Sequence, residues 1–393
     1  MAQATISTTN SDPLAAARAL APRIRELAPE IERAGRLPRE LVDAMLGAGL
    51  FHMVLPRHLG GNEVDPVTAA RAVEEVSAAD GSAGWCVMIA AQNQGFGGFF
   101  ETASIHEIWG NGGITCGVAR PIGRAVVTNS PAPGYLVSGR WPFASGSSHA
   151  TFFAGESVIY DGDTPRKDAN GNNISVFAVI PRDSVTVYET WDTAGLRGTA
   201  SNDFSCENVF VPLGRAPQMF QGPPVQDWPA YRAFPLLVVN HGSQALGVAR
   251  GAIETATELA KTKAGYGGVL LKDVARTQFV IAEATALREA ASEYLYAATQ
   301  RLWDAVVAGA PEDDTVQLRS RTRLAAAHAA RASVQAVDMV YAALGTSAVF
   351  KKTPLERHFR DIHTAAAHVM VGTLVMEAAG RVELGMSAEF PFF

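Results

Sequence analysis

The sequence predicts an α+β protein with an N-terminal helical domain, a middle antiparallel β-domain and a C-terminal four-helix bundle. Three observations support this. Residues 1–111 carry apolar side chains at helical spacing, 112–214 hold short β-rich runs between turn residues, and 215–393 return to long alanine-rich helical patterns. This order of elements does not by itself indicate a reaction.

The first zone begins with a helical pattern over Leu14–Ile31. Pro22 and Pro29 are expected to kink or divide that helix, because proline lacks the amide hydrogen that the helix needs. Asp65 followed by Pro66 is typical of a helix start, with a capping carboxylate before a proline in the first turn.

The middle zone reads as an antiparallel sheet or a small barrel. Its strands are expected at Ala125–Thr128, Tyr135–Ser138, Val176–Ile180 and Val185–Tyr188, and turn residues separate them. The polar stretch Asp168–Asn173 is expected at the exposed tip of a hairpin.

The last zone contains apolar residues at three- and four-residue steps. Val334, Val337, Tyr341 and Leu344 form one such face, and Gly345 is the expected stop. Long helices with alanine-rich faces favour a four-helix bundle.

Composition and charge argue against several classes of binding partner and cellular location. A formal net charge of −6 argues against nucleic acid or an anionic membrane as partner. No apolar run reaches the roughly 20 residues of a membrane span, and Met1–Ala16 lacks the pattern of a secretory signal. Three cysteines without a Cys-x-x-Cys pair indicate a reducing compartment and no metal cluster. We therefore expect a cytoplasmic protein.

Several strings, in order along the chain, resemble the acyl-CoA dehydrogenase superfamily. Leu55–Gly61 resembles its P-x-x-x-G-G element, Gly195–Ser201 followed by Val209–Pro212 resembles its exit from the β-domain, and Pro354–Asp361 resembles its P-x-E-R-x-x-R-D element. The resemblance covers nearly the whole chain and implies the same three-part fold and a homotetramer.

One string points to a branch of that superfamily. Gly139–Gly146 resembles the G-x-W-x-F-x-S-G segment of two-component flavin monooxygenases, which lies against the flavin ring. The resemblance implies that Trp141, Phe143 and Ser145 bind the cofactor and that Ser145 helps to hold a flavin C4a-hydroperoxide. A β-strand with aromatic core residues is the alternative interpretation.

The catalytic glutamate of the dehydrogenases is missing. No acid stands between Asp361 and Glu377, and the two positions where the superfamily places its base fall near Val369 and Leu237. Valine and leucine cannot abstract a proton from a thioester. This absence argues against acyl-CoA dehydrogenation.

His368 stands almost where that glutamate would be. Imidazole titrates near neutral pH, so His368 is expected to act as a base or to orient the substrate. The alternative is a satisfied core histidine. His363 lies five residues earlier, about 140° around a helix, and is expected to face elsewhere.

Other candidates come from the same resemblance. Lys263 stands where many relatives have an arginine on the adenine dinucleotide of FAD, which favours FMN. Ser347 belongs to a glycine-containing turn at the cofactor, and Arg357 either approaches the flavin or forms a helix salt bridge with Asp361. Polar and aromatic residues at element ends are candidates for substrate binding: Trp85, Arg120, Asn240 and His241, with His368, and more weakly Gln92, Asn93 and His149.

The sequence therefore predicts the oxygenase component of a flavin-dependent monooxygenase. Reduced FMN (FMNH2), or FAD in its place, would come from a separate flavin reductase, since no Gly-x-Gly-x-x-Gly unit for a nicotinamide follows a strand. With O2 it would oxygenate a small aromatic or heteroaromatic molecule. The alternatives are an FAD-dependent dehydrogenase or oxidase with a displaced base, and a binding protein without activity. The apolar end, Glu389–Phe393, is expected to dock on a partner subunit or to close a pocket.

Overall fold

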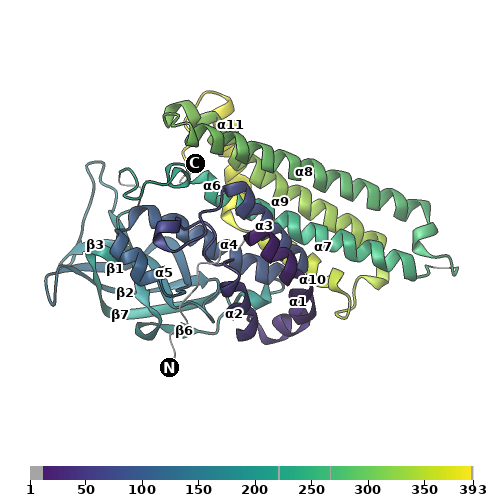
Figure 1. The fold of residues 1–393 in the computed structure, drawn as a ribbon, viewed down its shortest axis with the longest axis horizontal. Helices are drawn as coiled ribbons and strands as arrows, with labels where there is room; N and C mark the ends of the chain where they lie inside the picture. Colours follow the sequence, from purple (N-terminus) through teal and green to yellow (C-terminus); the bar gives the residue numbers. More distant parts are fainter. Residues whose placement is uncertain (1–11, 220–221, 266, 391–392) are drawn as a thin grey trace.

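The computed structural model describes residues 12–219, 222–265, 267–390 and 393. The sheet lies at one end of the molecule and the long helices extend from the other, with the N-terminal helices packed beside both (Figure 1). The predicted sequence of a helical domain, a sheet domain and a helical bundle is confirmed.

From residue 12 on, the N-terminal domain contains five α-helices: α1 Pro13–Ala34, α2 Arg39–Gly47, α3 Pro66–Ala79, α4 Gly81–Gly95 and α5 Thr102–Trp109. Asp65 caps α3 as predicted, since its carboxylate accepts from the backbone amides of Val67 and Thr68. The expected division of α1 is wrong. Pro22 and Pro29 lie inside one continuous helix, whose buried apolar face offsets the lost hydrogen bonds.

The β-domain is one sheet of seven strands: β1 Thr115–Thr128, β2 Gly134–Ala144, β3 Phe152–Asp161, β4 Thr164–Pro165, β5 Ser175–Pro181, β6 Thr186–Tyr188 and β7 Asn202–Pro212. Their order is β4-β3-β1-β2-β7-β6, and β5 pairs with β3. The prediction of a purely antiparallel domain is wrong at one place, because β1 and β3 run parallel. Strands β1 and β2 form an antiparallel hairpin. Strand β3, which follows β2 in the chain, pairs with the opposite edge of β1.

The hairpin tip at Asp168–Asn173 is confirmed. Its residues are largely exposed, and the Asp168 carboxylate accepts from the backbone amides of Asn170 and Asn172. Such side-chain bonds within a turn are typical of Asp and Asn.

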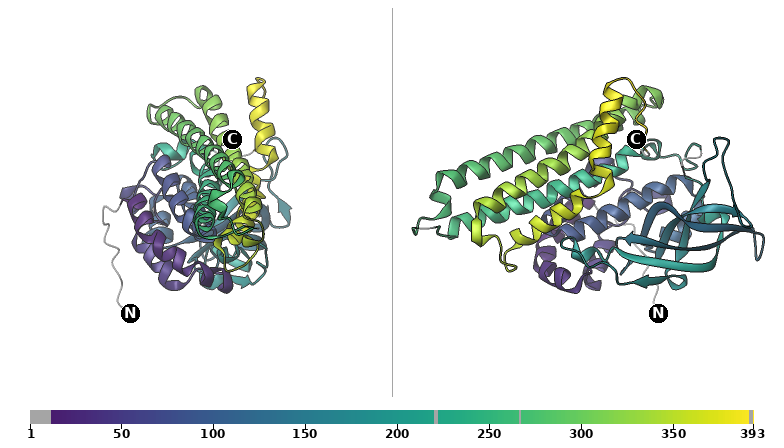
Figure 2. Two further views of the ribbon diagram at one scale, coloured as in Figure 1. Left: turned by 90° about the vertical axis from the view of Figure 1, so that its right-hand side faces the viewer. Right: turned by 180° about the vertical axis from the view of Figure 1, so that it is seen from behind.

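The C-terminal region comprises α6 Pro235–Val238, α7 Asn240–Thr262, α8 Ala275–Val307, α9 Val316–Ala343, α10 Pro354–Ala366 and α11 Thr373–Glu383. Helices α7, α8, α9 and α10 pack together, as Figure 2 shows from two further sides. Gly345 follows α9 with a φ of 52°, so the predicted stop is confirmed.

Helix α4 lies at the centre of the molecule. It contacts α3 and α7 on the helical side and β1 on the sheet side. Almost all of its residues are buried. Polar side chains on α4 therefore face both the sheet and the bundle.

Among the described residues, no single helix is long and apolar enough to cross a bilayer; one pair, Pro354–Ala366 with Val369–Glu383, meets that test together but is bent by 84°. The three cysteines, Cys86, Cys116 and Cys206, are free and buried.

Candidate active site

A chain of hydrogen bonds joins α4 to the β-domain. The Trp85 indole N–H lies 3.0 Å from Ser145 Oγ, and Ser145 Oγ lies 2.7 Å from Ser201 Oγ. Ser201 Oγ lies 2.6 Å from Thr199 Oγ1, which donates to the Leu196 carbonyl oxygen over 2.9 Å. All of these groups are buried, so the chain is shielded from water.

Only one orientation of the hydroxyl protons satisfies every bond in this chain. Thr199 donates to the Leu196 carbonyl, which can only accept, so the Ser201 proton must point to Thr199. The Ser145 proton must then point to Ser201, while Trp85 donates to Ser145. Ser145 therefore has no proton left to donate, and its oxygen keeps one lone pair for a further donor.

The same chain reaches α10. Asp361 Oδ1 accepts from the backbone amide of Leu196 over 2.6 Å. Burial, together with the nearby Asp80 carboxylate, raises the pKa of Asp361 to about 7. The expected salt bridge between Arg357 and Asp361 is wrong. Arg357 Nε instead lies 3.5 Å from Asp80 Oδ2, at the start of α4.

Two histidines lie against Trp85. The rings of His241, on α7, and His368, after α10, stack with centroids 4.5 Å apart and 18° between their planes. The Trp85 ring meets each of them edge to face, with centroids 5.5 Å apart. Three predicted residues from three distant segments thus form one cluster, and Ser145 joins it through Trp85.

His368 is not on the helix that the sequence suggested. Helix α10 ends at Ala366, and the His368 side chain caps the next helical turn, where its Nδ1 accepts from the Met370 backbone amide over 3.3 Å. The proton of a neutral His368 therefore sits on Nε2, which makes this nitrogen a donor. Burial and the Arg323 charge lower the pKa of His368 to about 4. His363 points elsewhere, with its Nε2 2.9 Å from an Asp338 carboxylate oxygen.

His241 is held by α4. Its Nε2 lies 3.0 Å from Gln92 Oε1, and its Nδ1 is buried and has no hydrogen-bond partner within the described chain. Burial, His368 and Arg323 lower the pKa of His241 well below its usual value, so the ring is neutral at pH 7. Asn240 Oδ1 is also buried and lacks a partner among the residues described. Both atoms therefore keep a hydrogen-bonding capacity that nothing in the described chain uses.

Two nearby aromatic residues of β2, Trp141 and Phe143, differ in their exposure to solvent. Phe143 is 64% exposed, has a φ of 66°, and faces the Trp191 ring with centroids 6.3 Å apart. Trp141 is 0% exposed, stacks on Phe204 and donates to the Glu156 carbonyl oxygen. The predicted contact of Trp141 with the flavin is therefore corrected: its ring is enclosed in the sheet core and leaves no face for a ligand.

The backbone beside Phe143 is strained. Leu196 and Ala200, which flank the helical turn Arg197–Thr199, also adopt positive φ values of 51° and 45°. Non-glycine residues in this conformation gather at ligand sites more often than elsewhere. An exposed phenyl ring, a tryptophan and a buried hydroxyl chain together suit a flat ring with polar edges, so the residues present fit an isoalloxazine group.

Other predicted residues lie outside this cluster in the chain. Exposed Lys263 follows α7, at the end of the bundle that points away from the sheet (Figure 1). Ser347 lies in the turn after α9, where its carbonyl accepts from the Thr353 hydroxyl. Arg120 is exposed on β1, and half-buried His149 packs on Phe51. Their roles remain predictions.

Sequence reasoning missed three kinds of residue. Thr199 and Ser201 stand in the Gly195–Ser201 string, but nothing in the sequence indicated that they meet Ser145. Trp191 carried no motif. Arg323 lies in an alanine-rich helical stretch with further arginines, a pattern that predicts a solvated face, yet it is fully buried. No group of three or more potential metal-ligating side chains occurs in the described part of the chain.

The chain is similar to known proteins along nearly its whole length. The family model of the acyl-CoA dehydrogenase N-terminal domain matches residues 14–102, and that of the C-terminal domain matches 239–373. An indole-3-acetate monooxygenase of Pseudomonas putida is 29% identical over 91% of this chain and 89% of its own. The flavin-dependent monooxygenase oxygenase subunit HsaA of Rhodococcus jostii is 30% identical over 89% of this chain and 92% of its own. The crystal structure of a 3-HSA hydroxylase from Rhodococcus sp. RHA1 covers 97% of this chain and 99% of its own, with a TM-score of 0.87 and 26% identity.

Proposed function

This chain belongs to the flavin-dependent monooxygenase branch of the acyl-CoA dehydrogenase superfamily, and we propose that it is the oxygenase component of a two-component system. A separate reductase supplies the reduced flavin, and the substrate is a small aromatic or heteroaromatic molecule. The relatives named for indole-3-acetate and 3-HSA support that substrate class. When bound, a reduced flavin supplies two electrons to dioxygen, so that one oxygen atom enters the substrate and the other leaves as water.

The observation that carries the proposal is the fixed direction of the hydroxyl chain. Ser145 can only accept, because its proton is committed to Ser201. A reduced isoalloxazine ring carries more N–H groups than the oxidised ring, so an acceptor at Ser145 favours the reduced form. This preference is what an enzyme needs when it receives its flavin already reduced.

The histidines shape the substrate side. A neutral His368 with its proton on Nε2 donates to an oxygen atom and orients it, in place of the base role that the sequence also allowed. The Trp85 and His241 rings pack against His368 and exclude water from it. Asn240 Oδ1 is available to accept from a substrate N–H or O–H.

Acyl-CoA dehydrogenation has little support in the same site. Val369, beside His368, is half exposed, and Leu237 is buried in the core of the N-terminal domain. Neither side chain can remove a proton. We therefore rank a dehydrogenase or oxidase second.

The proposal includes a homotetramer in the cytoplasm. Large apolar side chains are exposed along the outer helices, among them Phe279 on α8 and Leu374 on α11. Such residues are typical of subunit interfaces, and light scattering on the purified protein measures the assembly directly.

The test is an anaerobic titration with FMN and FAD in both redox states, followed by mixing with oxygen in a stopped-flow spectrometer. We expect the reduced forms to bind at least about tenfold more tightly, which corresponds to about 1.4 kcal/mol, and a transient absorbance to follow. Ser201→Ala should weaken the preference, because it frees the Ser145 proton. Ser147→Ala is the matched control, since Ser147 is buried nearby but bonds to the Ala200 carbonyl oxygen. Equal affinity for both redox states and a protein that is yellow as isolated would favour the dehydrogenase.

A further inference from the structure

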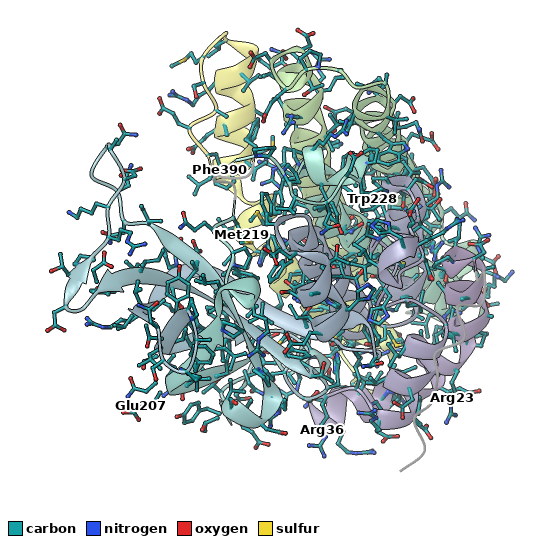
Figure 3. All side chains as sticks on the ribbon, turned by 60° about the vertical axis from the view of Figure 1, so that its left-hand side comes forward. Arg23, Arg36, Glu207, Met219, Trp228 and Phe390 are labelled. Atoms are coloured by element: carbon teal, nitrogen blue, oxygen red, sulfur yellow. The ribbon has the colours of Figure 1, made fainter. Side chains whose placement is uncertain are left out.

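Arg323 on α9 is a buried cation that has no counter-ion among the residues the structure describes. Its side chain is 0% exposed, and its Nε and Nη1 have no hydrogen-bond partner within the described residues. Its Nη2 lies 3.6 Å from the Met370 sulfur, and its guanidinium lies 5.7 Å from the ring centroid of Phe390. Phe390, labelled in Figure 3, lies near the lower end of α11 in that view. A thioether and a phenyl ring do not neutralise a charge.

This arginine remains charged at neutral pH. Burial lowers the pKa of Arg323 only to about 10, and no carboxylate of the described chain raises it again. An unpaired buried charge is costly, and proteins rarely keep one without a use. Arg319, one turn earlier on α9, shows the usual arrangement: its Nη1 lies 3.3 Å from a Glu312 carboxylate oxygen.

The charge of Arg323 acts on the histidine cluster. It is a cause of the lowered pKa of both His241 and His368. Met370, which contacts Arg323, is also the residue whose amide bonds to His368. Helices α7 and α9 are close at this level, since a Cβ built on Gly242 would lie 2.9 Å from the Ala326 Cα. Met370 and the close approach of α7 and α9 therefore link the guanidinium to the two rings.

We infer that the site takes its aromatic substrate in an anionic form, a phenolate or a carboxylate, and that Arg323 is the positioning residue that supplies the counter-charge. The two neutral imidazoles leave the guanidinium as the nearby positive charge, and in a dry interior its field is weakly screened. The Nε2–H of His368 then donates to the negative oxygen over a shorter range. This inference rests on the proposed function for the position of the substrate.

The phenolate form is tested with 4-nitrophenol, whose ionised form is read by its visible absorbance. Bound to the wild-type protein without flavin, it should show a pKa at least about one unit below its value in water, a tenfold change in the proton equilibrium. Arg323→Met, which keeps the volume and removes the charge, should cancel that shift. Arg323→Lys should restore most of it.

The carboxylate form is tested with phenylacetate and its neutral isostere phenylacetamide by titration calorimetry. The wild-type protein should bind the acid about tenfold more tightly, and Arg323→Met should lose that preference. Arg319→Met is the matched control and should keep it, because the Arg319 charge is already paired.

A wild-type protein that neither lowers the nitrophenol pKa nor prefers the acid overturns the inference, as does an Arg323→Met variant that behaves like wild type. A positive result with only one of the two ligands supports the inference and identifies the anionic group as the phenolate or the carboxylate. Should Arg323→Met fail to fold, Arg323→Gln, which also removes the charge, takes its place. Titration with reduced FMN separates the two proposals: normal flavin binding with no anion preference removes only this inference, while loss of selective binding of the reduced flavin removes the proposed function.

Discussion

Two arginines on neighbouring helices of the bundle are both buried, but among the described residues only one of them has a carboxylate partner. Arg288 on α8 donates to the Glu74 carboxylate on α3, which also accepts from the Tyr296 hydroxyl. Arg323 on α9 meets no carboxylate in the described chain. The Arg288 pair joins the N-terminal domain to the bundle, whereas the Arg323 charge faces the histidine cluster.

The presence or absence of a carboxylate partner distinguishes an arginine that supports the fold from one that serves the proposed site. A buried pair is strongly stabilising only in the sense that breaking it is costly. A buried charge without a partner lowers stability until a ligand neutralises it. Substitutions around Glu74 should therefore change unfolding, and substitutions around Trp85 should mainly change binding and turnover.

The largest effect is expected for Arg288→Met. It leaves the buried Glu74 carboxylate with the Tyr296 hydroxyl and a longer, 3.7 Å contact to Arg250, and should lower the free energy of unfolding by about 3 kcal/mol. Urea unfolding measures it, with Arg323→Met as the comparison. Arg323→Met should be as stable as wild type or more stable, and a similar loss in both variants would erase the distinction between the two arginines.

Ser145→Ala should affect the reaction next most strongly. It removes the acceptor for the Trp85 N–H and for the flavin, and the loss of one preorganised polar group in an active site costs about 10²-fold. The yield of oxygenated product per reduced flavin should fall and hydrogen peroxide should rise. The measurement is the ratio of the two, because the lost buried bond also costs about 1–3 kcal/mol of stability.

Phe143→Ala sharpens the contrast within β2. The ring is mostly exposed, so unfolding should change by less than about 0.5 kcal/mol. Loss of the ring face should weaken flavin binding by up to about tenfold. Trp141→Ala should do the reverse, with a large loss of stability and no direct effect on affinity; flavin fluorescence and thermal melting together distinguish them.

The effect that is smallest at neutral pH, and that grows only in acid, is a pH dependence of stability. His358 on α10 is buried beside Arg357, and its pKa is lowered to about 3. The unfolded chain takes up this proton near pH 6.5 and the folded one does not, so stability is full above pH 6.5 and falls as the pH drops towards 3. His358→Gln should flatten that slope by about 1 kcal/mol per pH unit. An unchanged slope would assign the proton uptake to other groups.

Local patterns in the sequence predicted the helical zones, four of the seven strands, and the caps at Asp65 and Gly345, but they missed β3, β4 and β7. They could not predict the parallel pairing of β1 with β3, because pairing depends on contacts between distant segments. The resemblance brought Ser145 and His368 forward for testing, and the structure places Trp85 and His241 beside them. The burial of Arg323 could not be predicted, because it results from the packing of four helices, and a sequence shows only the residue type.

The carboxylate of Asp361 has one further consequence. Through the amide of Leu196 it fastens α10 to the loop that carries Thr199, and the hydroxyls of Ser201 and Ser145 continue the connection to Trp85 on α4. All three domains are thus tied by a single line of short bonds that passes through the site. A shift of α10 would displace the hydroxyl chain at Ser145 and the segment that carries His368 together, so the two halves of the proposed site keep a common alignment.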